Sequence, residues 1–267
     1  MVSVTLLGTA QDGGVPQVGC DCCLDLEARY PVSIGLVDSE GNHHLFEATR
    51  NLGEQLRIWG TNSINSLFLT HAHFGHVDGL GLFGKETMNA KGISLHCSKI
   101  MLDLIERTPN WSILLSDGVF YPRTAQFVQL PGVSVEAIEV PHRSELSDMH
   151  AYLIKAEKTL LFLPDHDTWQ ETLREHDLRA WLNHLEVDIA LIDGTFFSSN
   201  ELKHRKQEEV PHPTVEQTLQ MLGERREGDG EVVFIHLNHT NPLCRDETPV
   251  TELGWKVGKE GMSFNLS

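Results

Sequence analysis

The chain has 267 residues, of which 40% are hydrophobic and 22% are charged, and it carries a formal net charge of −17. This length suits one large domain or two small ones, and the composition is that of a globular protein with a sizeable core. The acidic excess argues against binding to a phosphate backbone, which needs clustered Lys and Arg, and no apolar run approaches the roughly 18 residues that span a bilayer.

The N-terminal residues 2–7 are typical of a strand and lack the basic segment of a signal peptide. Of the five cysteines, Cys20, Cys22 and Cys23 crowd together, and an odd number in this arrangement does not suit a secreted disulfide framework. We therefore expect a protein of the reducing cytoplasm.

Periodicity and capping signals predict the regular elements. Short, largely apolar runs predict strands at residues 2–7, 32–37, 44–47, 66–70, 127–130, 133–140, 151–155, 159–162, 187–192, 232–235 and 261–266. Apolar residues at helical spacing predict helices at residues 51–59, 98–107, 171–185 and 214–222. Helices interleaved with strands in both halves predict an α/β fold of two mixed sheets packed face to face with helices outside, an αββα sandwich. No repeat or low-complexity linker divides the chain, so we expect one domain over residues 1–267.

Three histidines, His71, His73 and His76, lie within six residues directly after the predicted strand at residues 66–70. Imidazole is the commonest metal-binding side chain near neutral pH, and a tight loop can aim three of them at one or two ions. Structural zinc sites seldom use this spacing, so the cluster predicts a functional metal centre.

Polar side chains also end other predicted strands. His71, His142, Asp165, Asp193 and His236 each follow such a run at its C-terminal end. Loops at one rim of a rigid sheet are a common place for a site, so we expect these side chains to meet there.

Four segments in order resemble the motifs of the metallo-β-lactamase superfamily: residues 70–76 (Thr-His-Ala-His-Phe-Gly-His), 140–143, 161–165 and 234–238. The resemblance covers essentially the whole chain and implies the metallo-β-lactamase fold. The Gly-rich turn at residues 7–17, the cysteines at 20–23 and the His-Leu-Asn-His-Thr-Asn-Pro element at 236–242 are most similar to proteins related to pyrroloquinoline quinone (PQQ) biosynthesis protein B.

The resemblance implies two adjacent metal positions, the first held by His71, His73 and His142 and the second by a motif aspartate, His76 and His236. Asp165 would bridge both. Gly75 stands where the motif aspartate belongs, so we expect one tight ion and one weak or absent ion, and we expect Gly75→Asp to raise occupancy of the second position. Two other side chains are weaker substitutes for the missing carboxylate, Asp78 and His239. Zinc is the default metal for such a donor set, which also suits iron or manganese.

By the same resemblance, Asp193 and His212 would act together in proton transfer to the leaving group, as a histidine oriented by a carboxylate can. The alternatives are a turn-capping Asp193 and an exposed His212. His166 and Asp167 are candidates for orienting the metal ligands.

The cysteine cluster suggests a separate structural zinc held by Cys20, Cys22 and Cys23 with a fourth ligand from elsewhere, such as a histidine. The relatives space these cysteines as Cys-x-Cys-x-x-Cys, whereas this chain has Cys-x-Cys-Cys. A redox-active or inert thiol cluster is the alternative.

The function we expect is a metal-dependent hydrolase that uses metal-bound hydroxide on a small-molecule ester, amide or phosphodiester. An iron-dependent oxygenase and a non-catalytic metal-binding accessory protein are the alternatives. We expect a small-molecule substrate, with pocket-forming loops at residues 109–123 and 198–213, and no nucleic-acid or membrane partner. A homodimer is compatible with this sequence.

Overall fold

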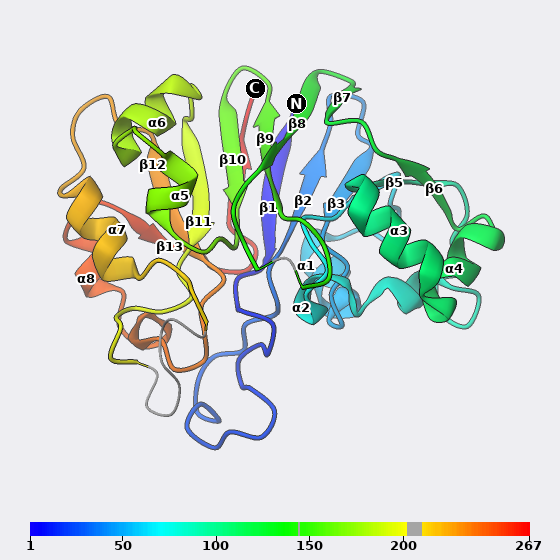
Figure 1. Cartoon of the computed structure of the whole chain (residues 1–267), viewed down its shortest axis with the longest axis horizontal. Coiled ribbons are helices and arrows are strands. Elements are labelled where there is room, and N and C mark those ends of the chain that lie inside the picture. Colours follow the sequence, from blue (N-terminus) through cyan, green and yellow to red (C-terminus); the bar gives the residue numbers. More distant parts are fainter. Residues whose placement is uncertain (144, 202–209) are drawn as a thin grey trace.

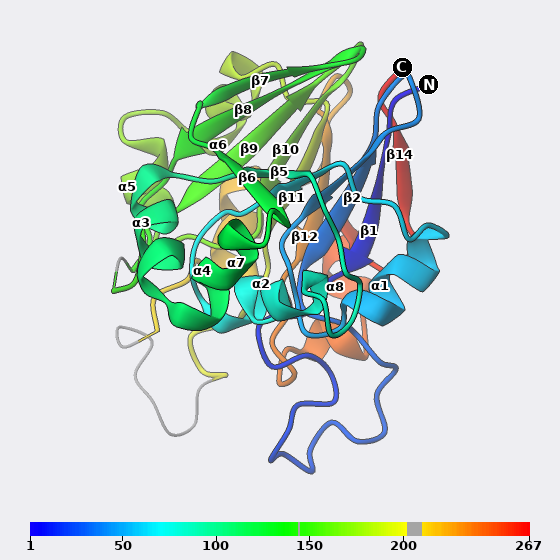
Figure 2. The same cartoon turned by 90° about the vertical axis from the view of Figure 1, so that its right-hand side faces the viewer.

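The computed structural model describes residues 1–143, 145–201 and 210–267 as two sheets packed face to face with helices on both outer faces (Figures 1 and 2). This confirms the predicted αββα sandwich. The first sheet has the order β14 (Ser263–Asn265), β1 (Ser3–Gly8), β2 (Ser33–Val37), β3 (His43–Phe46), β4 (Ser66–Phe68), β5 (Ile93–His96), β6 (Phe120–Arg123). The second has the order β13 (Lys256–Val257), β12 (Glu231–Ile235), β11 (Ile189–Asp193), β10 (Thr159–Leu163), β9 (His150–Lys155), β8 (Val133–Glu139), β7 (Phe127–Leu130).

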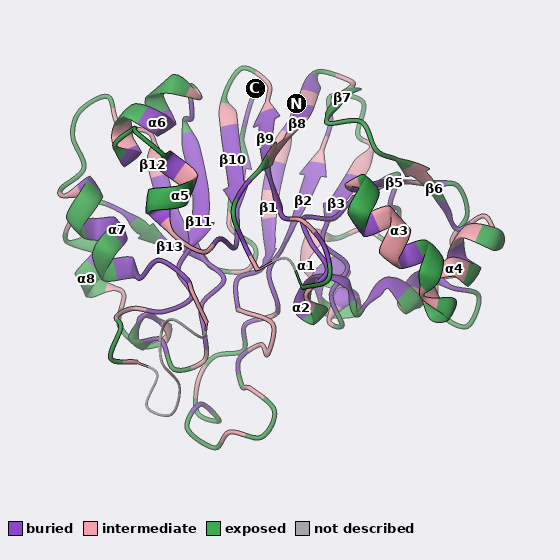
Figure 3. Cartoon of the chain, in the orientation of Figure 1, coloured by how far each residue is buried: buried purple, intermediate pink, exposed green. Residues whose placement is uncertain are grey.

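The helices cover each sheet separately. The first sheet packs against α1 (Leu52–Trp59), α3 (Lys99–Arg107) and α4 (Pro109–Ser116), and the short α2 (Phe74–Val77) and η1 (Leu80–Phe83) follow β4. The second sheet packs against α5 (Trp169–Leu173), α6 (Leu178–His184), α7 (Val215–Leu222) and α8 (Thr248–Thr251), with η3 (Pro242–Cys244) after β12. Figure 3 shows the consequence: the strands are largely buried and the helices expose one side.

Two differences from the predicted elements have local causes. Residues 109–123 form no loop, because Pro109 starts α4 at a first-turn position that tolerates proline and Pro122 is accommodated in β6 at the edge of its sheet. The predicted helix 171–185 divides into α5 and α6 at Arg174, whose φ of 56° ends the first helix. The other expected pocket loop, 198–213, lies partly outside the described residues.

Strand direction places the site. β1, β3, β4 and β5 run the same way in the first sheet, and β8, β10, β11 and β12 do so in the second. Their carboxyl ends meet at the lower rim in Figure 1, where the long N-terminal segment also passes. Loops from both sheets can therefore contribute to one centre.

No helix among the described residues is long and apolar enough to cross a membrane.

The core between the sheets is centred on aromatic side chains. Phe46 is fully buried and stacks on Phe68 with ring centroids 4.6 Å apart, and it meets Tyr152 and Phe162 edge-on at 5.3 and 6.0 Å. Offset-stacked and edge-to-face contacts stabilise such clusters beyond the burial of apolar area. Phe46 therefore links the two sheets directly above the rim.

We predict that Phe46→Ala lowers the free energy of unfolding by about 3–5 kcal/mol, because it leaves a cavity between the sheets. Urea denaturation in the presence of a chelator measures the change without a contribution from bound metal. Phe127→Ala is the matched control, since Phe127 is 55% exposed on the edge strand β7, and it should cost much less. Equal losses in the two variants would contradict the role given to Phe46.

Candidate metal centre

Four predicted ligands converge at the rim. Suitable atoms of His71, His73, His142 and Asp165 all lie within 4.8 Å of one another, although they come from the loops after β4, β8 and β10. Asp165 Oδ2 is 3.2 Å from His142 Nε2 and 3.5 Å from His71 Nε2. Three of the four are buried, and the His73 side chain is 17% exposed, so this group is open to solvent on one side.

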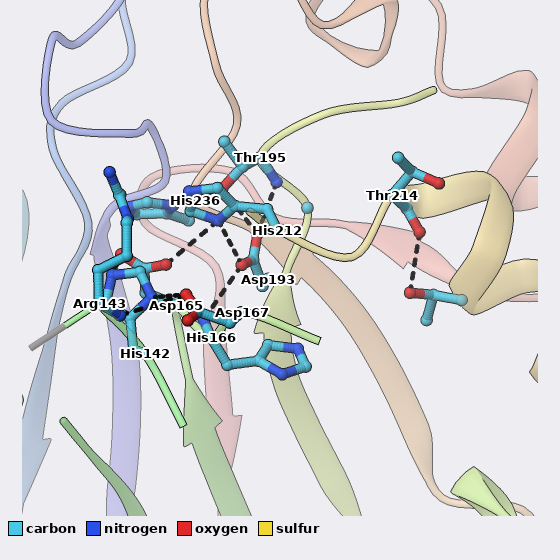
Figure 4. Close-up of polar contacts among 12 residues, drawn as sticks. His142, Arg143, Asp165, His166, Asp167, Asp193, Thr195, His212, Thr214 and His236 are labelled. Atoms are coloured by element: carbon cyan, nitrogen blue, oxygen red, sulfur yellow. Dashed lines mark hydrogen bonds and ion pairs between the residues drawn. The ribbon is translucent and has the colours of Figure 1, made fainter. Parts of the chain in front are cut away.

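The orientation of the His142 ring is fixed by a neighbouring carboxylate. Its Nδ1 lies 2.9 Å from Asp167 Oδ1 (Figure 4), and because a carboxylate only accepts, Nδ1 must donate. Nε2 then faces Asp165, at 3.2 Å, and His73 Nδ1, at 3.3 Å. Asp167 is held in turn by the Arg143 backbone N–H, at 3.2 Å. This is the outer-layer role expected of Asp167.

A second group is formed by His76, His236 and Asp12, whose ligand atoms also lie within 4.8 Å of one another. His76 Nε2 is 3.6 Å from Asp12 Oδ1, and its Nδ1 is 3.4 Å from the buried Glu47 Oε1. Burial disfavours a charged imidazole, but Glu47 and Asp12 outweigh it and raise the pKa of His76 to about 9. The pocket around His76 thus carries an excess of negative charge that favours a cation.

The second group therefore contains a carboxylate, that of Asp12, although Gly75 stands where the motif aspartate belongs. A Cβ atom on Gly75 would lie 2.5 Å from Asp12 Cα and closer still to Asp12 Oδ1. The space that a side chain at position 75 would need is therefore occupied by Asp12, which arrives from the turn after β1. For the same reason Gly75→Asp cannot simply add a ligand, because it would collide with Asp12.

The two weaker substitutes do not lie there. Asp78 forms an ion pair with Arg50, at 2.7 Å, and His239 joins the cysteines described below. His166 also differs from expectation, because its ring turns away from the centre (Figure 4). Its Nδ1 lies 2.9 Å from Oγ1 of Thr172 in α5.

His236 is oriented through a hydroxyl. Thr195 Oγ1 lies 2.7 Å from both His236 Nδ1 and Asp193 Oδ1 (Figure 4). Since the carboxylate must accept the one hydroxyl proton, the hydroxyl accepts from His236 Nδ1, and Nε2 carries the lone pair. The backbone of His236 has a φ of 61°, a left-handed conformation that is costly for a non-glycine residue and often marks a functional position.

Asp193 and His212 lie together beside these ligands. His212 Nδ1 is 2.8 Å from Asp193 Oδ2 and 3.2 Å from Asp165 Oδ1 (Figure 4). Burial opposes a charge on His212, but Asp193 and Asp165 outweigh it and raise its pKa to about 9. The alternative of an exposed His212 is wrong, since it is 5% exposed.

The donors suit a divalent ion. Buried atoms His71 Nε2, His236 Nε2 and Asp12 Oδ1 have no hydrogen-bond partner among the described residues, although buried polar atoms are normally paired. Burial lowers the pKa of His71 well below its ordinary value and that of His236 to about 4, so both imidazoles are neutral, as ligation requires. Although burial opposes it, the imidazoles of His212 and His142 hold the pKa of Asp165 well below its usual range. Neutral imidazoles and ionised carboxylates fit zinc, iron or manganese.

The cysteine cluster forms a separate group. Cys20, Cys22 and His239 have ligand atoms within 4.8 Å of one another, and the two Sγ atoms are 2.8 Å apart. Cys23 is not a member, because neighbouring residues face different ways: it is fully buried, and its Sγ accepts the Gln17 backbone N–H at 3.3 Å.

Sequence reasoning missed three residues of the centre, Asp12, Glu47 and Thr195. Each lies in the loop that follows a strand ending at this rim: Asp12 after β1, Glu47 after β3 and Thr195 after β11. Asp12 lies within a motif that the sequence did single out, the Gly-rich turn at 7–17, and Glu47 is the last residue of the predicted strand at 44–47. Only their approach to His76 and His236 identifies them, and that is a long-range contact.

Comparison with known proteins is consistent with this geometry. A sequence model described as the Beta-lactamase superfamily domain matches residues 20–261. The chain is 23% identical over 307 residues to Coenzyme PQQ synthesis protein B of Azotobacter vinelandii, covering 98% of this chain and 99% of that protein. It is 23% identical over 285 residues to an octanoyltransferase of Porphyromonas gingivalis, covering 96% of this chain but only 50% of that protein, so it spans about half of that relative's length. The crystal structure of Zn²⁺-bound PqqB from Methylobacterium extorquens superposes with a TM-score of 0.79 at 21% identity, covering 99% of this chain and 100% of that one.

We predict that Asp167→Asn weakens metal binding at the first group roughly 10–100-fold, because a neutral amide replaces the anionic acceptor that orients the His142 ring and increases its basicity. Competition with a chelator of known affinity measures the change. Glu139→Gln, an exposed carboxylate three residues before His142, is the control and should leave the affinity unchanged. An Asp167→Asn protein that retains wild-type affinity would remove Asp167 from the centre.

Proposed function

The chain belongs to the β-lactamase superfamily, and on that premise we propose that it is a metal-dependent hydrolase of a small-molecule ester, amide or phosphodiester. The observation that carries this proposal is the first group, in which His71, His73, His142 and Asp165 meet at an open rim. Three imidazoles and one carboxylate are a donor set that leaves a coordination position for water. Zinc is the metal we propose, with iron as the alternative that would favour an oxygenase.

A divalent ion bound there would supply a Lewis acid and lower the pKa of a coordinated water to about 7. The chain's own residues supply the rest. Asp165 lies 3.2 Å from both His142 and His212. It therefore contacts both the metal-binding group and the pair formed by His212 and Asp193. Asp193 accepts from His212 Nδ1 and fixes the ring. His212 is thereby placed to deliver a proton to the leaving group, a contribution of roughly 10²–10⁴-fold.

A pocket next to His212 supports a substrate of small-molecule size. Its volume is about 670 Å³, and it runs between α5 and α7 with His212 and Asp167 in its wall. Binding sites for small molecules typically have volumes of this order. The remaining lining includes Arg174, Gln217 and Gln220, which can hydrogen-bond polar substrate groups. The net charge of −17 also makes a nucleic acid a poor substrate.

We expect purified protein to contain zinc and to hydrolyse at least one of three reporters: bis(p-nitrophenyl) phosphate, p-nitrophenyl acetate and nitrocefin. His71→Ala with Asp165→Ala should lose metal and turnover, because the donor set is broken. His212→Asn should keep its metal but lose about 10²–10⁴ in kcat. Metal content by mass spectrometry and steady-state kinetics measure both. Undiminished turnover after complete removal of metal would disprove the hydrolytic mechanism, and iron with dioxygen consumption would favour the oxygenase.

For the cysteine cluster we propose a separate structural zinc. Cys20 and Cys22 supply two sulfurs and His239 one nitrogen, a donor set typical of structural zinc sites. The cluster joins the N-terminal segment to the loop after β12, so an ion there would fasten two segments that are distant in sequence.

We expect Cys22→Ser and His239→Ala each to lose about one zinc ion per chain and to lower the thermal midpoint. Cys23→Ala is the control, because Cys23 lies outside the group, and it should keep full metal content. Thiolate-to-cobalt charge-transfer absorption of Co²⁺-substituted protein reports this site separately. Wild-type protein without that absorption would leave the cysteines as an inert thiol cluster.

A further inference from the structure

We infer that Asp12 is the carboxylate ligand of the second metal position, in place of the motif residue that this chain has replaced by Gly75. The inference rests on the proposed metal-dependent function for the ion itself. What it adds is the identity of the residue that holds the second ion.

Three metal-binding side chains converge at the second position. Asp12 Oδ1 lies 3.6 Å from His76 Nε2 and, with His236, forms a group whose ligand atoms are all within 4.8 Å. His76 and His236 are each 1% exposed. His236 Nε2 and Asp12 Oδ1 are buried atoms without a hydrogen-bond partner among residues the structure describes. Three converging donors, two of them unpartnered among these residues, therefore surround a point where a cation would satisfy them.

A side chain at position 75 and the observed place of Asp12 exclude each other. A Cβ at position 75 would lie 2.5 Å from Asp12 Cα, far inside the van der Waals contact distance of two carbon atoms. A glycine at 75 is therefore the condition that lets Asp12 approach His76. The histidine loop thus lacks a carboxylate at position 75, and the N-terminal turn places the Asp12 carboxylate in the same space.

Backbone hydrogen bonds fix the turn that contains Asp12 on the loop that carries His236. Ala10 and Leu237 pair in a parallel bridge, with Gln11 N–H donating to Leu237 O at 2.9 Å and Leu237 N–H to Thr9 O at 2.9 Å. Gly14 N–H then closes a turn onto Gln11 O at 2.8 Å. Asp12 sits in that turn, held in register with His236, so no flexible loop has to reach the ion.

A second carboxylate, that of Glu47, lies on the other side of His76. Glu47 Oε1 lies 3.4 Å from His76 Nδ1, on the opposite side of the ring from Asp12. A carboxylate behind a ligating histidine orients the ring and increases its basicity, as in carboxylate–histidine–metal arrangements. Glu47 thus faces His76 Nδ1 and orients the ring, and Asp12 lies on the Nε2 side, where the ion would bind.

The test measures zinc per chain in protein stripped with a chelator, reloaded with Zn²⁺ and dialysed. Asp12→Asn, which keeps the shape but removes the charge, is expected to lose about one zinc ion per chain. Asp78→Asn is the matched control, because Asp78 lies three residues beyond Gly75 yet pairs with Arg50, and it should keep wild-type content. Circular dichroism in chelator confirms that each variant is folded.

A second variant places a carboxylate on the histidine loop. Gly75→Asp should not raise the zinc content above wild type, because its Cβ would collide with the backbone as well as the side chain of Asp12. Full zinc content and affinity in folded Asp12→Asn would overturn the inference, as would a Gly75→Asp protein that binds more zinc than wild type. Wild-type protein that binds no zinc at the histidines would instead refute the proposed function, so the two failures are distinguishable.

Discussion

The shared direction of the parallel strands in the two sheets is the constraint on which the centre depends. β3 and β4 of one sheet and β10, β11 and β12 of the other all end at one rim. Their carboxyl ends bring histidines from one sheet against carboxylates from the other. The aromatic core around Phe46 holds the sheets together directly above. Small changes in sheet packing would therefore move ligands relative to each other.

Burial of so many polar groups is costly unless they are paired. At this rim a carboxylate pairs with the outer ring nitrogen of three imidazoles. Asp167 pairs with His142, Glu47 with His76, and Asp193 with His236 by way of the Thr195 hydroxyl. Each arrangement leaves the other ring nitrogen directed inward. These inward ring nitrogens and the surplus of negative charge in the middle are complementary to a divalent cation.

The N-terminal segment is part of the centre and not merely a connection between β1 and β2. It provides Asp12 near its start and Cys20 and Cys22 near its middle. Both parts of the segment lie against the loop that contains His236 and His239. Two clusters of metal-binding side chains thus lie between the same pair of loops. This placement explains why the Gly-rich turn, the cysteines and the 236–242 element occur together in one chain.

The sequence by itself determined the sandwich of two sheets, most of its strands, and the metal-binding character of His71, His73 and His76. These follow from local periodicity and spacing, since apolar runs and a His-x-His-x-x-His loop are visible within a few residues. It misjudged segments whose structure depends on proline position, such as residues 109–123. Only the tertiary structure decided that Asp12 occupies the space beside Gly75, that His239 faces the cysteines and that Cys23 does not. Those facts depend on contacts between residues about 60 to 220 positions apart in the chain, and no local pattern specifies which distant side chain fills a gap left by a glycine.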